Sequence, residues 1–394
     1  MSTEKSTQAL NILQSCYGEN GVWASPHRYR YQCWTRDLAL AILPALIRFG
    51  GERGAGLARR HLEALSVRIR EDGRVPILFA DDLWKMLGVK VEEAVDRHKI
   101  GFPLRRMIEE GGEEGLYNLT PGTKDSEIMY IVAMLEYANL TGDHTLLIRF
   151  YGQIFHAYWY VKEHLLRDGL VVGCDWRDTM EKELGDKTLL TNNSLWYHAL
   201  SMLAEFSTDL NGVWHNDAEA ASLIYGEQFA AEAAALKDLI NERFFVNGAY
   251  QDRPEVLHID PLGTSLAVLY GIVPPERYLA VVSALMNVNT SYGVTISCRH
   301  NPQTEAEALV IEETNGVVVW PFIVGFTVMA LAHMGEFGLA RNQFAKLESH
   351  SGFYEYYNPA NGFAMGSADQ LWSAVLYLRA AAAIGELSLE QQAS

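Results

Sequence analysis

The sequence has few cysteines and a shortage of basic side chains, and each shortage excludes a class of protein. Its four cysteines include no CxxC pair and no short spacing, which argues against a disulfide scaffold, a zinc site or a redox motif. We expect free, mostly buried thiols in a reducing cytoplasm. The chain has only 32 Lys and Arg residues against 49 Asp and Glu residues, so its formal net charge is −17. That balance argues against a nucleic-acid partner, because phosphate binding needs clustered cations.

Signals for export or membrane insertion are also lacking. The opening residues, MSTEKSTQAL, contain no apolar stretch after a basic start, so no secretory signal is predicted. Val317 to Met334 is 18 residues without a formal charge, but it contains Pro321 and Gly325 and is flanked by acidic residues. This pattern favours a buried helix preceded by a short extended run over a membrane span. We therefore expect a cytoplasmic protein with no membrane partner.

Helical periodicity is present along most of the chain. Hydrophobic residues make up 49% and charged residues 21%, which is typical of a globular protein. Leu371, Val375, Leu378 and Ala382 have the spacing of one helical face. Strand-like runs, such as residues 294–298, are brief. About a dozen helices are predicted, over residues 6–16, 36–48, 55–70, 91–110, 126–141, 144–166, 193–209, 216–243, 262–271, 276–287, 319–335, 337–349 and 367–386.

Long and short connections alternate between these helices. Short turns at Thr141-Gly142-Asp143 and Gly335-Glu336 predict antiparallel helical hairpins. Loops longer than about 12 to 15 residues usually carry function, and in a ring of hairpins the long ones would meet at one end and line one pocket. No linker divides residues 1–394, and no repeat of about 34 or 40 residues supports an α-solenoid. The long connections are residues 17–35, 72–90, 111–125, 167–192, 244–261, 288–318 and 350–366.

Two charged clusters precede apolar helices. Trp34, Arg36 and Asp37 combine a flat aromatic face with hydrogen-bond donors and acceptors, which is what a sugar subsite requires. Asp125 lies in a similar charged segment before Ile128. The structural alternative for both aspartates is an N-cap that accepts hydrogen bonds from the first turn of its helix.

Two further clusters add carboxylates beside aromatic rings. Asp175 and Asp178 flank Trp176 and Arg177, and burial against an indole raises a carboxyl pKa while a cation opposes the rise. Glu355 lies among four aromatic residues in a segment that the following proline keeps from being helical. Two carboxylates from distant loops suit a glycosidase, in which one protonates the leaving oxygen and the other activates water. The alternative for each carboxylate alone is a solvated surface charge.

Other chemistries have little support in the sequence. It contains no HExxH, no P-loop, no GxSxG and no GxGxxG after a strand. The 12 histidines are scattered, so a metal centre is not expected. We predict that the chain uses no metal and no cofactor.

The four clusters, in this order, resemble those of the inverting glycoside hydrolases built on an (α/α)6 barrel. Trp34-Thr35-Arg36-Asp37 is similar to a stretch in glucoamylases, and Lys124-Asp125-Ser126 resembles one in glycogen-debranching glucosidases and neutral/alkaline invertases. Trp176-Arg177-Asp178 resembles the segment that carries the general acid in those families. Val319-Trp320-Pro321 and Glu355-Tyr356-Tyr357 resemble segments of the invertases and of the mannosylglycerate hydrolase and glucosidase I group, whose glutamate is the general base.

The resemblance spans residues 25–385 and implies one all-α (α/α)6 barrel domain over residues 1–394. It implies Asp178 as the acid and Glu355 as the base. Asp175 is a competing acid because it follows Gly173-Cys174, as the acid of the mannosylglycerate hydrolase group follows Gly-Met. Thr179-Met180-Glu181 stands where invertases have a basic pair, so sucrose is not assured as the substrate. The expected substrate-binding residues are Trp34, Arg36, Asp37, Asp125, Trp176, Arg177, Trp320, Tyr356 and Trp372.

The predicted function is therefore an inverting exo-α-glycosidase that hydrolyses a small α-glucoside. Candidate substrates are a disaccharide such as sucrose and a glucosyl- or mannosylglycerate type of solute. The alternatives are a sugar 2-epimerase on a similar helical toroid, which would use histidine pairs, and a carbohydrate-binding protein without catalysis. The linkage, the choice between glucose and mannose, and a homo-oligomeric state all stay open.

Overall fold

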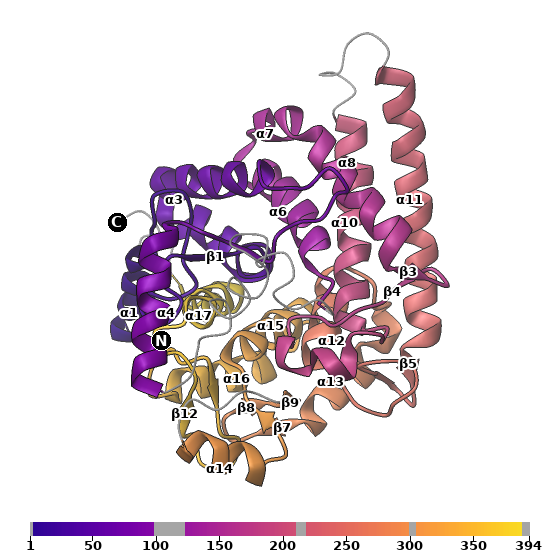
Figure 1. The fold of residues 1–394 in the computed structure, drawn as a ribbon. Coiled ribbons are helices and arrows are strands. Elements are labelled where there is room, and N and C mark those ends of the chain that lie inside the picture. Colours follow the sequence, from indigo (N-terminus) through magenta and orange to yellow (C-terminus); the bar gives the residue numbers. More distant parts are fainter. Residues whose placement is uncertain (1–2, 98–122, 210–217, 299–304, 388–394) are drawn as a thin grey trace.

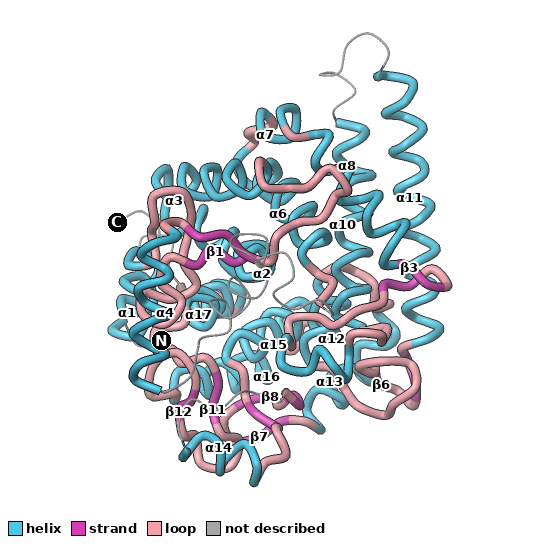
Figure 2. Tube along the Cα trace, in the orientation of Figure 1, coloured by secondary structure: helices cyan, strands magenta, loops and turns pink. Residues whose placement is uncertain are grey.

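The computed structural model describes residues 3–97, 123–209, 218–298 and 305–387, and these residues are mainly helical (Figures 1 and 2). Within these ranges, six helices pack in order around a closed path, each against the next, and the last packs against the first. The first of them comprises α2 (Thr35–Asp37), the π-helix η1 (Leu38–Ile42) and the start of α3 (Leu43–Ser66). The others are α6 (Ser126–Thr141), α10 (Leu190–Asp209), α12 (Pro261–Leu269), α15 (Pro321–His333) and α17 (Leu371–Ala383).

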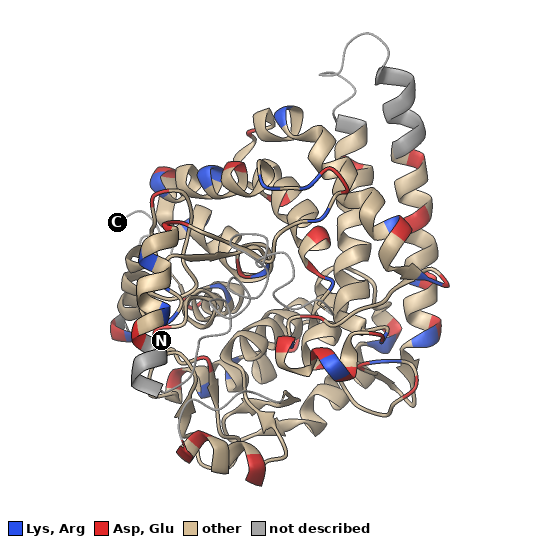
Figure 3. Ribbon diagram, in the orientation of Figure 1, with Lys and Arg blue, Asp and Glu red and all other residues tan. Residues whose placement is uncertain are grey.

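These six inner helices form the core because they are apolar on nearly all sides. Helices α12 and α15 contain no Lys, Arg, Asp or Glu, and most charged side chains belong to other elements (Figure 3). A helix that is hydrophobic all round is buried. Gly325 permits the close contact between α15 and α17, since a Cβ there would lie 2.8 Å from the Cβ of Leu376. The described helices include none with the length and apolarity that crossing a membrane requires.

Outer helices alternate with the inner ones along the chain. Gly51, with φ of 55°, separates the inner start of α3 from its outer remainder. Helix α1 packs against α17, α8 against α6, α11 against α10 and α16 against α15 (Figure 1). The outer helices are α1 (Thr3–Ser15), the remainder of α3, α8 (Tyr151–Tyr160), α11 (Ala218–Arg243), α13 (Tyr278–Asn287) and α16 (Phe337–Ser349).

The connections carry short antiparallel hairpins and short helices. In the described ranges every sheet has two strands. The pairs are β1 (Gln32–Trp34) with β2 (Leu78–Ala80), β3 (Leu166–Arg167) with β4 (Leu170–Val171), β5 (Phe245–Val246) with β6 (Ala249–Tyr250), β7 (Asn289–Thr290) with β8 (Gly293–Val294), β9 (Ile296–Ser297) with β10 (Val317–Val318), and β11 (Tyr356–Tyr357) with β12 (Ala364–Met365). The short helices are α4 (Leu83–Arg97), α7 (Thr145–Arg149), η3 (Val161–Leu165), η4 (Asp178–Met180), α9 (Glu181–Leu184), η6 (Pro275–Arg277) and α14 (Glu305–Glu313).

Most predicted helices occur close to their expected bounds. Helices α6 and α16 have the predicted residues, and the apolar run from Val317 is a short strand followed by buried α15, as predicted. The predicted helix 144–166 was wrong as a single element, because a turn at Phe150 and the π-helix η3 divide it. Helix α14 lies in a segment expected to be a loop, and α4 begins earlier than predicted. Residues 98–122, which include parts of two predicted segments, lie outside the described residues.

Candidate active site

The predicted site residues gather at the N-terminal ends of the inner helices, where the long connections enter. Hydrogen bonds tie these connections together. The amide of Lys124 donates to the carbonyl of Cys174 at 2.9 Å, and the amide of Leu371 donates to that of Ala24 at 2.9 Å. The arrangement brings clusters far apart in the sequence to one end of the helices.

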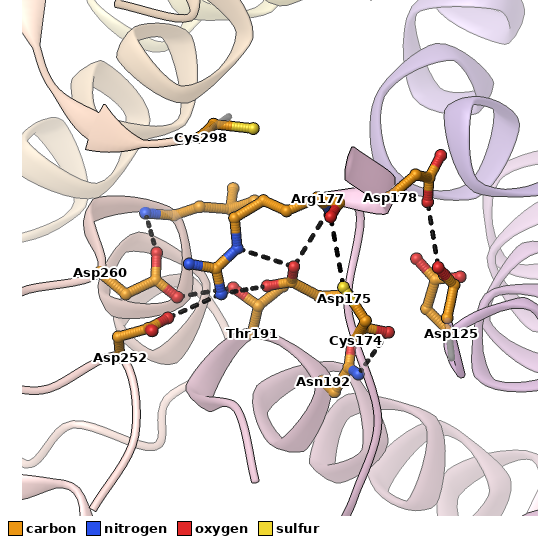
Figure 4. Close-up of polar contacts among 12 residues, drawn as sticks. Asp125, Cys174, Asp175, Arg177, Asp178, Thr191, Asn192, Asp252, Asp260 and Cys298 are labelled. Atoms are coloured by element: carbon orange, nitrogen blue, oxygen red, sulfur yellow. Dashed lines mark hydrogen bonds and ion pairs between the residues drawn. The ribbon is translucent and has the colours of Figure 1, made fainter. Parts of the chain in front are cut away.

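Arg36 joins the first three clusters. Its guanidinium contacts both carboxylate oxygens of Asp178 at 3.0 Å, and its Nη1 also donates to Asp125 at 3.3 Å. The Thr123 hydroxyl donates to Asp178 at 3.2 Å. The side chain of Asp178 is 21% exposed, whereas that of Asp125 is 1% exposed. Asp178 is thus the more exposed carboxylate of this group, and Figure 4 shows it on the same side of the site as Asp125.

Neither Asp37 nor Asp125 caps a helix with its side chain, so the N-cap alternative was wrong for both. Asp37 lies within the helix, and Asp125 occupies the N-cap position of α6 without making the capping bond. By contrast, Asp260 does cap α12 through the amide of Leu262 at 3.0 Å. Oxygen Oδ1 of Asp125 is buried and has no hydrogen-bond partner among the described residues, so it is free to accept one from a ligand.

Burial has the largest effect on the pKa values of Asp37 and Asp125. It raises the pKa of Asp37 to about 7, Arg36 lowers that pKa, and the charges of Asp178 and Glu355 raise it again. Burial likewise raises the pKa of Asp125 to about 7, against the opposing effect of Arg36. Because both Asp178 and Glu355 act on Asp37, the two candidate catalytic carboxylates share one neighbourhood with it.

Glu355 is held by groups that the sequence analysis did not single out. Its Oε2 accepts from the amide of Ser367 at 2.9 Å, and its Oε1 accepts from the Tyr29 hydroxyl at 3.2 Å. A guanidinium nitrogen of Arg28 lies 3.7 Å from Oε2. The alternation of arginine and tyrosine over residues 28–31, just before the first cluster, was a signal for such a role. Glu355 precedes β11 and is not helical, as predicted.

Asp175 lies in a different environment from Asp178. Arg177 contacts both its carboxylate oxygens at 2.8 Å, and the Arg177 backbone amide donates to it at 3.1 Å. Arg177 also contacts Asp252 at 2.7 Å (Figure 4). Burial would lower the pKa of Arg177, but Asp175 and Asp252 outweigh it and raise that pKa well above its usual value. The side chain of Asp175 is buried and Arg177 holds both of its oxygens, so Asp175 links loops within the interior.

The predicted aromatic residues fall into two groups. Trp34 lies beside the carboxylates, with its ring centroid 6.3 Å from that of Tyr29 and 5.7 Å from the guanidinium of Arg36. The remaining predicted rings form a buried cluster: Trp176, Trp320, Tyr356 and Trp372, joined by Phe322.

Several indole nitrogens in these two groups lack partners. The Nε1 atoms of Trp34, Trp176 and Trp372 are buried without a hydrogen-bond partner among the described residues. Because buried polar groups are normally satisfied, such donors are available to an oxygen-rich ligand. In the described ranges, His, Cys, Asp and Glu side chains do not form a group of three that could hold a metal ion.

Residues 190–373 match the family model described as the mannosylglycerate hydrolase MGH1-like glycoside hydrolase domain. No curated protein sequence matches the chain. A wild-type glycosidase structure shares 17% identity at a TM-score of 0.65, covering 98% of this chain and 97% of that one, and a variant of it in complex with glucose matches equally well.

A second relative has a more specific name. The GH63 mannosylglycerate hydrolase from Thermus thermophilus, solved with Tris and D-glycerate, shares 15% identity at a TM-score of 0.59, covering 95% of this chain and 99% of that one. At such identities the structural likeness shows the fold alone. Together with the family match over residues 190–373, it confirms the predicted resemblance of this chain to glycoside hydrolases of the mannosylglycerate hydrolase MGH1-like type.

Proposed function

We propose that the protein is an inverting exo-α-glycosidase that acts on a small α-glucoside, with its inner and outer helices forming an (α/α)6 barrel. The observation that carries the proposal is the placement of Asp178 and Glu355. They come from loops 177 positions apart, and the charges of both act on the buried Asp37. Hydrolysis with inversion requires two carboxyl groups that flank the glycosidic bond of the bound sugar.

The sugar would be held by Arg36, Asp37 and Asp125. At neutral pH the two aspartates, whose pKa values burial raises to about 7, can each accept or donate a hydrogen bond. Hydroxyl groups both donate and accept, so they suit such partners. Trp34 supplies an apolar face for the C–H groups of the sugar ring.

In the proposed reaction Asp178 protonates the glycosidic oxygen. Arg36 and Thr123 both donate to Oδ1 of Asp178, whereas Oδ2 accepts from Arg36 alone and keeps a lone pair that can carry the proton to be donated. Glu355 takes a proton from water as that water attacks the anomeric carbon from the opposite face, and the C–O bond to the leaving group breaks. Inverting enzymes hold their carboxyl groups about 6.5 to 9.5 Å apart to admit this water.

The orientation of Glu355 supports its role as the base. The Ser367 amide and the Tyr29 hydroxyl each use one lone pair of a different oxygen, which leaves acceptor sites on both oxygens for water. Asp175 and Arg177, predicted as a second acid and a substrate ligand, are better placed to hold the loop that carries Asp178, since Arg177 connects it to Asp252.

The charge of the site favours a neutral or cationic substrate. Four carboxyl groups, from Asp37, Asp125, Asp178 and Glu355, outnumber the two arginines near them, Arg28 and Arg36. A panel of sucrose, trehalose, kojibiose, nigerose, maltose, isomaltose, glucosylglycerate and mannosylglycerate would identify the aglycone. The two glycerates test directly whether an anionic group is accepted.

The stereochemical test is the anomer released during the first minutes of hydrolysis, read by proton NMR. We expect the β-anomer from an α-glycoside; release of the α-anomer would refute inversion. Asp178→Asn and Glu355→Gln should each reduce kcat by about a hundredfold to ten-thousandfold, on the scale of losing a general acid or base. Asp186→Asn, which neutralises an exposed carboxylate on the same connection, is the matched control and should leave kcat unchanged.

The other predicted functions have less support. A 2-epimerase would use histidine pairs for proton transfer, whereas the partners of Asp178 and Glu355 in the described ranges are arginine, threonine and tyrosine side chains and a backbone amide. A carbohydrate-binding protein without catalysis would bind a monosaccharide but would release no monosaccharide from the glycosides of the substrate panel.

A further inference from the structure

The helix that carries Arg36 and Asp37 contains a π-turn directly after them. Residues Leu38–Ile42 form the π-helix η1, in which the amide of Leu43 bonds to the carbonyl of Leu38, five residues earlier. Single π-turns inside α-helices often occur at functional sites, and an inserted residue rotates the preceding turn by about 100° relative to the following one. The π-turn therefore sets the direction in which Arg36 and Asp37 point.

The sequence contains a local cause for this turn. Pro44 lies at the start of α3, within an otherwise continuous helix. Proline has no amide hydrogen, and its ring collides with the carbonyl four residues earlier, which is that of Leu40. Pro44 thus leaves this buried carbonyl without its α-helical donor.

Arg379, on the inner helix α17, supplies a donor at this position. Its Nη1 donates to the carbonyl of Leu40 at 3.2 Å and to that of Ala41 at 3.1 Å. Helix α17 packs directly against η1, and the guanidinium lies 5.5 Å from the ring centroid of Phe326. The contact spans 339 sequence positions and joins the last inner helix to the first.

We propose that Arg379 is a positioning residue, which holds the π-turn after Asp37 and thereby keeps Arg36 and Asp37 oriented toward the sugar. The inference rests on the proposed function, because the sugar-binding role of Arg36 and Asp37 belongs to it. Nothing in the sequence motifs pointed to Arg379, which lies in the last inner helix, far along the chain from the first cluster. Its hydrogen bonds reach the backbone of the sugar-binding helix and not its side chains.

A competing role for Arg379 is charge neutralisation. The carboxyl group of Glu136, on α6, acts electrostatically on Arg379 and opposes the lowering of its pKa by burial. If Arg379 only balanced Glu136, then removing both charges together would restore the wild-type site. If Arg379 holds the π-turn, removing Glu136 cannot compensate, because the carbonyls of Leu40 and Ala41 still lose the guanidinium as a donor.

The test compares Arg379→Met, Arg379→Lys and the double variant Glu136→Gln/Arg379→Met, with Arg341→Met on the exposed face of α16 as the matched control. Glucose affinity is measured by calorimetry, and amide hydrogen exchange is followed in the peptide covering residues 36–48. We expect Arg379→Met to weaken glucose binding at least tenfold and to speed exchange in that peptide. Arg379→Lys, which keeps a charged donor, should recover part of both.

The outcomes separate this inference from the proposed function. Wild-type affinity in Arg379→Met, an unchanged exchange rate in residues 36–48, or restored binding in the double variant would each overturn the positioning role. If instead the wild-type protein neither binds nor releases any sugar, the proposed function fails, and the positioning of a sugar site fails with it. The exchange rates then still report whether Arg379 holds the π-turn.

Discussion

Asp37 and Asp125 differ from the buried Asp260 in the hydrogen bonds that their side chains make. Both are buried beside Arg36, and burial raises the pKa of each to about 7. Asp260 is buried too, but it caps a helix. The side chains of the two aspartates near Arg36 make no capping hydrogen bond to a helix end, which is consistent with a role in binding a ligand.

The raised pKa of Asp37 predicts a dependence of stability on pH. An unfolded aspartate titrates near 3.9, so between about pH 4 and pH 7 the folded protein binds more protons at this site than the unfolded chain does. The contribution of Asp37 is therefore fully present below about pH 4 and is lost as the pH rises through about 7. Asp37→Asn removes this loss and should raise the free energy of unfolding at pH 8 by up to about 4 kcal/mol relative to wild type.

Urea unfolding of both proteins at pH 4 and pH 8 measures this difference. At pH 4 the gain should be much smaller, because the wild-type carboxyl is then largely protonated. The variant should also bind glucose more weakly, since an amide offers one acceptor oxygen in place of two and carries no charge. Equal effects of the substitution at the two pH values would show that Asp37 does not titrate in this range. Asp186→Asn, at an exposed site, should show no such pH-dependent gain.

At the scale of elements, the β11–β12 hairpin positions Glu355. Tyr356 pairs with Met365, and the backbone amide of Glu355 donates to the carbonyl of Ser367 at 2.9 Å. Gly366 has φ of 78°, and a Cβ there would lie 2.5 Å from the Cβ of Glu355. Only glycine meets both conditions without moving the glutamate.

Gly366→Ala should therefore displace Glu355 and reduce kcat by about a hundredfold, since small displacements of a catalytic group are costly. Gly385→Ala is a matched control, because Gly385 has a similar φ of 73° but nothing within 4 Å of an added Cβ. It should cost stability of about 1 kcal/mol through backbone strain and leave kcat near wild type. Steady-state kinetics with thermal unfolding of both variants distinguish the two effects; equal loss of kcat in both would contradict the contact with Glu355.

At the scale of the whole molecule, contacts between the two ends of the described chain complete the helical packing. Helix α1 packs against α17. The ammonium group of Lys5 donates to the carbonyls of Leu347 and His350 at 2.6 and 2.8 Å, at the end of α16. This contact satisfies helix-end carbonyls that have no partner within their own helix.

Lys5→Met should lower the free energy of unfolding by about 2 to 3 kcal/mol, because it leaves buried carbonyls without donors. The measurement is urea unfolding followed by circular dichroism, with Lys187→Met, at an exposed ion pair, as the control. We expect one cooperative transition at lower urea for Lys5→Met and no shift for the control. An unchanged midpoint for Lys5→Met would show that the ends of the chain contribute little to stability.

Much of the fold could be predicted from the sequence because its determinants are local. The periodicity of α17 and the glycine turn after α6 depend on residues within a few positions of one another. The non-helical state of Glu355 likewise follows from the nearby Pro359. Helix α14 was missed, since its short segment lacks a clear apolar face.

The sequence by itself determined the helical class, the positions of the long connections and the carboxylates within them. Only the tertiary structure decided that Asp178 is partly exposed beside Arg36 while Asp175, in the same loop, is enclosed by Arg177. It also decided that Tyr29 meets Glu355 across 326 positions and that Arg379 meets the helix of Asp37. The physical reason is that burial and ion pairing depend on which distant segments pack together, and local patterns carry no information about those partners.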